Sequence, residues 1–231
     1  MNTQRIAAIF EKDYKDFLKN SSLLVTAAIP IFMALLYSQM DFGGEMTFAV
    51  FTIVGITFSA VTAGSMITMM AEEKEKNTLR GLIQSPASFI DIIIGKCLLT
   101  SVVTIIVLGI SLLLIGFEPL LETRMIIGTI LAFIFFLFLG IGVGLFAKTL
   151  ASTYVYTTPI MIVFGFTPIL LSIDFFINNK VASTIIEYFP MIQLLEIDET
   201  SSWVPLGIIG IWLVASIIFA FVLFKKAVKD D

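Results

Sequence analysis

The chain has 231 residues, of which 58% are hydrophobic and 14% are charged, and its mean hydropathy is +1.02. Soluble domains carry about 25% charged residues, so the composition predicts an integral membrane protein with little mass outside the bilayer. The net charge of −4 provides no basic surface for nucleic acid, the single cysteine excludes a disulfide within the chain, and the lack of histidine excludes histidine-based acid–base catalysis.

Residues 1–21 have the pattern of an amphipathic helix. Charged side chains fall largely between the apolar ones, at Arg5, Lys12, Asp13, Lys15 and Lys19. Such a helix lies in the plane of the membrane–water interface, and the alternative is a solvated tail. The apolar side chains that recur at helical spacing are Ile6, Ile9, Phe10, Tyr14, Phe17 and Leu18.

Six apolar runs then come close to the roughly 20 residues that a membrane-spanning helix needs. The third run begins with Asp91 and Lys96, so its uninterrupted apolar part starts near residue 97. We therefore expect an all-α integral membrane protein in which residues 1–231 form one domain with six transmembrane helices. The runs cover residues 22–40, 46–71, 89–116, 125–147, 153–173 and 203–224.

The second run carries a line of hydroxyl groups, several of them three residues apart, so that they share one helix face. Two functions are open for this face. It can make hydrogen bonds and close contacts with neighbouring helices, or it can line a translocation path. The residues are Thr57, Ser59, Thr62, Ser65 and Thr68.

The most charged stretch of the chain, EEKEKNTLRGLIQSP at residues 72–86, follows the second run. Residues 72–76 extend the second span into water, and Asn77 or Thr78 can begin a new helix that Pro86 ends. Residues 72–88 are thus predicted to hold a short helix whose apolar face packs on lipid headgroups or on another protein. That face consists of Leu79, Leu82 and Ile83.

The later part of the chain adds two features. Gly140 and Gly144, in the fourth run, form a GxxxG pattern that is typical of close helix packing. Residues 174–202 are too apolar for a free loop, yet contain no run long enough to span a membrane. We expect one or two short helices there, re-entering the outer interface before the sixth span.

Basic residues are unequally divided between the two sides that six spans define. Because cytoplasmic loops carry the excess of Lys and Arg, both termini and residues 72–88 are predicted to be cytoplasmic, in a protein of the cell membrane. One side holds only Arg124 and Lys180. The other holds Arg5, Lys12, Lys15, Lys19, Lys74, Lys76, Arg80, Lys96, Lys148, Lys225, Lys226 and Lys229.

Several kinds of chemistry are not expected. The middle parts of the spans have no ionisable side chain, which disfavours a proton-coupled carrier. Gly95-Lys96 has no glycine five residues earlier, and Lys148 does not directly follow a glycine, so neither forms a phosphate-binding loop. With one cysteine and no histidine, a metal site is not expected either.

The stretch around residues 72–96 resembles the signature of the type-2 ABC exporter permeases. In that family acidic residues precede Gly-Thr-Leu-Glu, a short apolar helix, Pro-x-Ser and then Gly-Lys in the next span. This chain departs at two positions, with Asn77 in place of Gly and Arg80 in place of Glu. The matching residues are Glu73, Glu75, Thr78, Leu79, Leu82, Ile83, Pro86, Ser88, Gly95 and Lys96.

The resemblance implies a coupling helix that docks on a separate ATP-binding subunit, which would hold ATP and Mg; this chain would bind no cofactor. Two permeases, identical or homologous, would form the translocation path in the lipid bilayer. The implied cargo is an amphipathic or hydrophobic compound such as a peptide, lantibiotic or drug. Coupling would depend on Glu73, Glu75, Asn77, Thr78, Leu79, Arg80, Leu82, Ile83 and Pro86.

Two other functions are consistent with the residues. One is a non-transporting immunity or sensor component that binds a peptide at its outer face. The other is an ion-coupled secondary carrier, which the missing mid-span charge disfavours.

Overall fold

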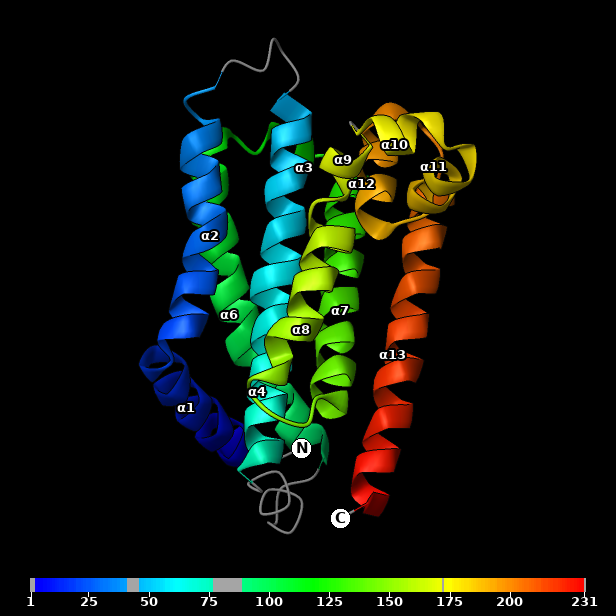
Figure 1. Cartoon of the computed structure of the whole chain (residues 1–231). Coiled ribbons are helices and arrows are strands. Elements are labelled where there is room, and N and C mark those ends of the chain that lie inside the picture. The colour runs from blue at the N-terminus through cyan, green and yellow to red at the C-terminus, as the bar shows by residue number, and fades with distance from the viewer. Residues whose placement is uncertain (1–2, 41–45, 77–88, 172, 231) are drawn as a thin grey trace.

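The computed structural model describes residues 3–40, 46–76, 89–171 and 173–230, and every regular element within these ranges is helical (Figure 1). The long helices run side by side as one bundle, and both chain ends lie at the same end of it. The elements of the first half are α1 (Thr3–Lys19), α2 (Ser21–Tyr37), α3 (Met46–Ile56), the π-helix η1 (Thr57–Ala63), α4 (Gly64–Glu75) and α6 (Phe89–Ile115).

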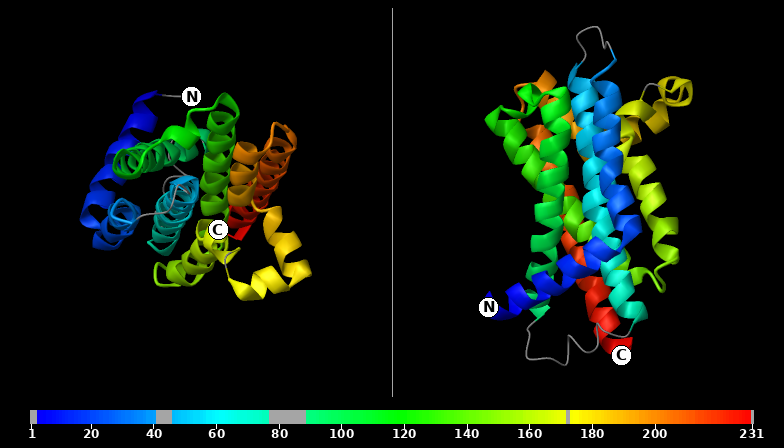
Figure 2. Two further views of the ribbon diagram at one scale, coloured as in Figure 1. Left: turned by 90° about the horizontal axis from the view of Figure 1, so that it is seen from above. Right: turned by 90° about the vertical axis from the view of Figure 1, so that its left-hand side faces the viewer.

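The second half begins with a 3₁₀ turn and ends with a long helix. Between them the chain forms several short elements, most of which gather at the end of the bundle opposite the termini (Figure 2). The elements of the second half are η2 (Glu118–Leu120), α7 (Thr123–Phe146), α8 (Ser152–Ile160), the π-helix η3 (Met161–Gly165), α9 (Thr167–Leu170), α10 (Asp174–Asn178), α11 (Lys180–Glu187), α12 (Pro190–Glu199) and α13 (Val204–Asp230).

Four continuous helical stretches are long and apolar enough to cross a membrane, and α1 with α2 make a fifth if that bent pair is one span. The six predicted runs are thus represented by four or five candidates in the described part of the chain. The run at 153–173 is divided among α8, η3 and α9. The four stretches are Thr47–Glu75, Asp91–Ile115, Thr123–Phe146 and Val204–Lys226.

An 81° bend separates α1 from α2 at Asn20. The Asn20 side chain accepts hydrogen bonds from the backbone N–H groups of Ser22 and Leu23, at 3.1 and 3.3 Å. This is the usual way in which an asparagine satisfies the first donors of a helix. The bend lets α1 leave the bundle axis and cross its neighbours at the end of the bundle where both chain ends lie (Figure 1).

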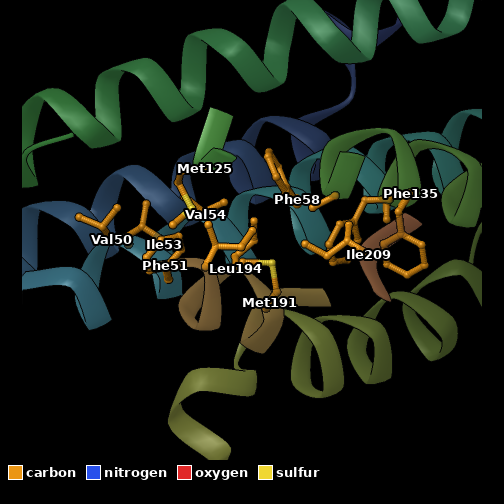
Figure 3. Packing of buried hydrophobic residues seen from close by; sticks show 14 of the residues in the cluster. Val50, Phe51, Ile53, Val54, Phe58, Met125, Phe135, Met191, Leu194 and Ile209 are labelled. Carbon is orange, nitrogen blue, oxygen red and sulfur yellow. The ribbon is translucent and has the colours of Figure 1, made fainter. Parts of the chain in front are cut away.

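The stretch from α3 through η1 to α4 forms the centre of the bundle. Its most apolar window is completely buried, and it contributes the largest share of the main core cluster (Figure 3). This burial explains why the stretch is apolar on all sides rather than amphipathic. The labelled core residues are Val50, Phe51, Ile53, Val54, Phe58, Met125, Phe135, Met191, Leu194 and Ile209.

Residues 174–202 form three short helices, one more than the most that we expected. They are held to the bundle by an aromatic cluster in which Phe164 and Trp212 rings lie 5.6 Å apart and Phe189 contacts both. The Trp212 indole donates a hydrogen bond of 2.7 Å to the Tyr188 carbonyl. Buried indoles generally require such an acceptor.

Candidate functional site

The residues predicted to couple the chain to a partner fall at the end of α4 and beyond it. Glu73 and Glu75 are in the last turn of α4, which ends at Glu75, and the next helix begins at Phe89. The other coupling residues, Asn77, Thr78, Leu79, Arg80, Leu82, Ile83 and Pro86, lie outside the described residues.

Glu73 does not extend into water as we expected, because it is only 4% exposed. One of its oxygens, Oε1, accepts from Lys12 Nζ on α1 at 2.6 Å and pairs with Lys96 Nζ on α6 at 2.9 Å. The expectation was wrong because α1 crosses this end of α4 and covers it, a contact that local sequence does not reveal.

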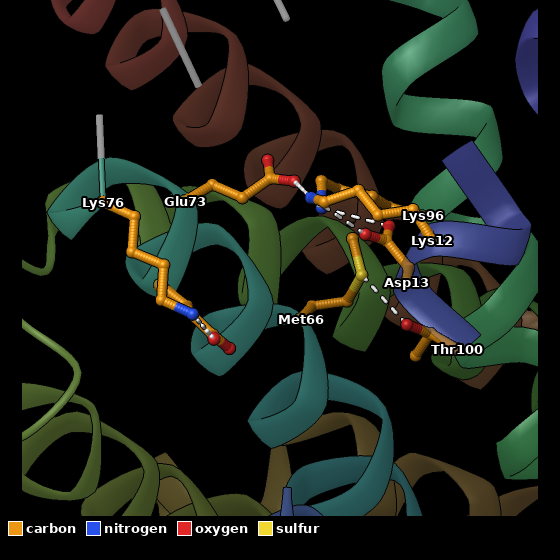
Figure 4. Close-up of polar contacts among 8 residues, drawn as sticks. Lys12, Asp13, Met66, Glu73, Lys76, Lys96 and Thr100 are labelled. Atoms are coloured by element: carbon orange, nitrogen blue, oxygen red, sulfur yellow. Dashed lines mark hydrogen bonds and ion pairs between the residues drawn. The ribbon is translucent and has the colours of Figure 1, made fainter. Parts of the chain in front are cut away.

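Lys96 is completely buried, and its ammonium group also lies 3.1 Å from Asp13 Oδ2 on α1. Asp13 is 3% exposed, although we expected it on the polar face of the N-terminal helix. Lys12, Asp13, Glu73 and Lys96 therefore form one ionic cluster between three helices, called the Lys96 cluster below (Figure 4).

The sequence contained a signal for the position of Asp13. The buried residues of α1 are Ile6, Ile9, Asp13 and Phe17, spaced by three or four residues, whereas Tyr14 is about half exposed. This spacing is that of a single helix face. The stripe passes through Asp13, and a carboxylate inside such a stripe requires a buried cation as its partner.

The Lys96 cluster combines two cations with two carboxylates, so its formal charges cancel. Burial raises the pKa of the Asp13 carboxyl above its ordinary value of 3.8, Lys96 opposes this change, and the like charge of Glu73 adds to it. A cavity of about 210 Å³ adjoins the cluster. Asp16, Met69, Glu72 and Lys76 complete its lining.

The two residues after Glu73 contact further parts of the bundle. Lys74 Nζ donates to the Leu145 carbonyl in the last turn of α7 at 2.8 Å, a favourable position for a cation at a helix C-terminus. The Glu75 carboxylate accepts from the backbone N–H of Leu150, in the connection between α7 and α8. Residues 73–75 thus contact α1, α6, α7 and the residues before α8.

The hydroxyl line of the second run is buried, with Thr57, Ser59 and Thr62 at 0% exposure and Ser65 at 2%. Thr57 and Ser59 donate to carbonyls four residues earlier, at 2.7 Å each. Thr62 is 2.9 Å from the Thr104 hydroxyl of α6. Thr68 is partly exposed. Thr57, Ser59 and Thr62 therefore have hydrogen-bond partners within the chain.

Gly140 and Gly144 face α4. A Cβ atom on Gly140 would lie 2.7 Å from Met66 Cβ and 2.8 Å from the Ala63 carbonyl oxygen. At Gly144 it would lie 2.7 Å from Met70 Cβ and 2.9 Å from the Ile67 carbonyl oxygen. All of these distances are shorter than the contacts that Cβ atoms make in proteins. The backbone of α7 therefore approaches α4 and the end of η1 as closely as glycine permits.

No group of three or more cysteine and acidic residues in the described ranges could hold a metal ion. A comparison with curated proteins found no match. Residues 7–228 match the family described as ABC-2 family transporter protein. This match covers nearly the whole chain, and in this family the membrane component pairs with separate subunits that bind and hydrolyse ATP. The chain therefore belongs to the ABC-2 transporter family and is a multi-pass membrane permease without ATPase activity of its own.

Proposed function

We propose that this chain is the permease of an ATP-driven exporter and that it receives energy from its ATP-binding partner through residues 77–88. One observation carries the proposal. The helix that leads into this stretch ends in Glu73, Lys74 and Glu75, which contact four other parts of the bundle. A displacement applied just beyond α4 would therefore act on the whole inner end of the protein.

The proposed architecture has six spans, with both termini and residues 72–88 in the cytoplasm. Helix α2 would be the first span, and residues 152–170 the fifth, divided among three elements. The position of both chain ends at the same end of the bundle as the end of α4 supports this topology (Figure 1), as does the distribution of Lys and Arg. Helix α1 would then lie at the inner membrane surface, and α10 to α12 at the outer one.

Two such permeases, identical or homologous, would form the translocation path at their interface, for an amphipathic or hydrophobic cargo such as a peptide, lantibiotic or drug. In the conformation described here the hydroxyls of Thr57 and Ser59 bond to carbonyls of their own helical stretch, that of Thr62 bonds to Thr104 of α6, and Ser65 is buried. They would line a path only in a conformation in which η1 separates from α6 and η3.

The test is to purify the chain with its ATP-binding subunit, reconstitute the complex in liposomes and measure ATP hydrolysis. Leu79→Asp with Leu82→Asp places two charges on the predicted docking face, and we expect the partner to be lost or its hydrolysis to fall to the rate of the isolated subunit. Leu79→Met with Leu82→Met is the matched control and keeps both. Normal assembly and hydrolysis in the aspartate variant would contradict the coupling role.

A further inference from the structure

The Lys96 cluster joins the two helices that flank the proposed coupling stretch. Glu73 is two residues before the end of α4, which leads into residues 77–88, and Lys96 is the eighth residue of α6, which follows them. Their side chains meet at 2.9 Å. Further along the same two helices, Thr100 donates to the sulfur of Met66 at 3.1 Å (Figure 4). Two contacts, about one to two helical turns apart along the helices, thus join the inner ends of α4 and α6.

The same cluster includes α1, which is distant from this region along the chain. Asp13 pairs with Lys96 at 3.1 Å, across 83 residues of sequence, and Lys12 pairs with Glu73 at 2.6 Å. Next to these ion pairs, a Cβ atom on Gly95 would lie 2.7 Å from Ile9 Cγ2, so α1 rests directly on the α6 backbone. Polar and apolar contacts therefore hold α1 at one place on α6.

Buried ion pairs add little net stability to a contact between helices. Desolvation opposes their formation, and well-packed apolar residues of similar volume serve stability equally well or better. They do fix the relative position of the elements that carry them, since each charge must keep its partner. Lys96 has two carboxylate partners on two different helices, so it constrains α1, α4 and α6 together.

We propose that Asp13, Glu73 and Lys96 are positioning residues for energy coupling, which make α1 and the inner ends of α4 and α6 move as one unit when ATP binds to the partner. This inference rests on the proposed function. It implies that the N-terminal helix at the membrane surface is displaced in each cycle together with residues 77–88.

The first experiment separates this role from a purely structural one. The neutral variant combines Asp13→Asn, Glu73→Gln and Lys96→Met, which leaves none of these three positions charged and should therefore assemble. We expect its ATP hydrolysis per assembled complex to fall about tenfold, within the range of ordinary allosteric coupling. The control variant, Glu72→Gln with Lys76→Met, removes an exposed pair of the same helix end and should retain the wild-type rate.

The movement itself is measured with an environment-sensitive fluorophore on Tyr14→Cys, in a Cys97→Ser background. Tyr14 is on α1 and 47% exposed. Trapping the complex with ATP should shift the emission in the otherwise unchanged protein and in the Glu72/Lys76 control, but not in the neutral variant. An emission unaffected by nucleotide in the unchanged protein would contradict movement of α1.

A disulfide provides a second test that removes no charge. Ile9→Cys with Gly95→Cys, again with Cys97→Ser, places two Cβ atoms about 1 Å closer than the usual disulfide separation. If α1 and α6 move together, oxidation should leave ATP hydrolysis unchanged, and in the neutral variant it should restore the rate until the bond is reduced. Inhibition by the disulfide would show that the helices must separate.

The outcomes distinguish the two proposals. If the wild-type chain neither retains an ATP-binding subunit nor stimulates its hydrolysis, the proposed function fails. If it does both, and the neutral variant hydrolyses ATP and shifts its emission like the wild type, only the role of the Lys96 cluster fails.

Discussion

Lys96 and Asp13 form an ion pair of 3.1 Å between the N-terminal helix and a long helix 83 residues later, and both side chains are buried. Because Glu73 shares the same ammonium group, the pair connects α1 to both helices that border the proposed coupling stretch. The mechanical role proposed for α1 and the stability of this end of the bundle therefore depend on the same few atoms.

The first prediction concerns stability. Lys96→Met alone leaves two buried carboxylates without their shared cation, and breaking buried pairs in this way costs about 3–5 kcal/mol. Lys76→Met breaks an exposed pair with Glu72 and should cost no more than about 1 kcal/mol. The free energy of unfolding, from denaturant titration in detergent micelles, measures both.

The neutral variant completes this comparison. Replacement of all three charges should recover most of the unfolding free energy that Lys96→Met loses, because the one charge of the cluster that remains is on Lys12, whose side chain is 42% exposed to solvent. If the neutral variant were as unstable as Lys96→Met, the cost would come from lost packing of the lysine chain rather than from charge.

The second prediction concerns the titration of Asp13. Burial raises its pKa above 3.8, so its carbonyl stretch, assigned by its loss in Asp13→Asn, should titrate above the ordinary range in infrared spectra. Glu73→Gln removes a like charge and should lower the midpoint, whereas Lys96→Met removes a cation and should raise it. Shifts in the same direction for both variants would be inconsistent with the cluster.

This pKa also fixes the sign of a stability effect. At pH values between 3.8 and the raised pKa of Asp13, this carboxyl group is protonated in a larger fraction of folded molecules than of unfolded chains. The contribution of this group to the unfolding free energy is therefore fully present below 3.8 and falls as pH rises through the folded pKa. Relative to Asp13→Asn, the wild type should lose stability over this window as pH increases.

The third prediction concerns helix packing. Gly140→Ala would place a Cβ atom 2.8 Å from the Ala63 carbonyl oxygen at the end of η1, so α7 must shift, and we expect a cost of about 1–3 kcal/mol in unfolding free energy. Gly109→Ala on α6 is the matched control because nothing lies within 4 Å of its added atom. Equal stability of the two variants would show that α7 adapts freely at Gly140.

Much of the fold followed from apolar run length. The runs at 89–116 and 125–147 correspond to α6 (Phe89–Ile115) and α7 (Thr123–Phe146) within two residues at each end, because hydrocarbon burial requires helices of that length. The second run and its predicted extension through residues 72–76 correspond to the helix that continues to Glu75. Glu73 in its last turn is covered by α1, and charge alone gave no indication of that cover.

The site was less accessible to sequence analysis. Local patterns identified residues 72–88 as unusual, but not that Glu73, Asp13 and Lys96 meet, because their contact depends on the 81° bend that directs α1 across the bundle. The apolar residues of α1 also form two faces, one turned inward through Ile9 and one outward through Tyr14. The spacing of Ile6, Ile9 and Phe17 places Asp13 on the first of these faces, but spacing alone did not show which face would be buried.

The central claim is that an ATP-binding subunit contacts residues 77–88, and site-specific photo-crosslinking tests it most directly. A benzophenone amino acid incorporated at position 82 should, on illumination of membranes, attach this chain to an ATP-binding subunit. The same probe at the exposed position of Leu113 on α6 should not. Crosslinking at position 82 to lipid alone, with the ATP-binding subunit present in the same membranes, would contradict the account.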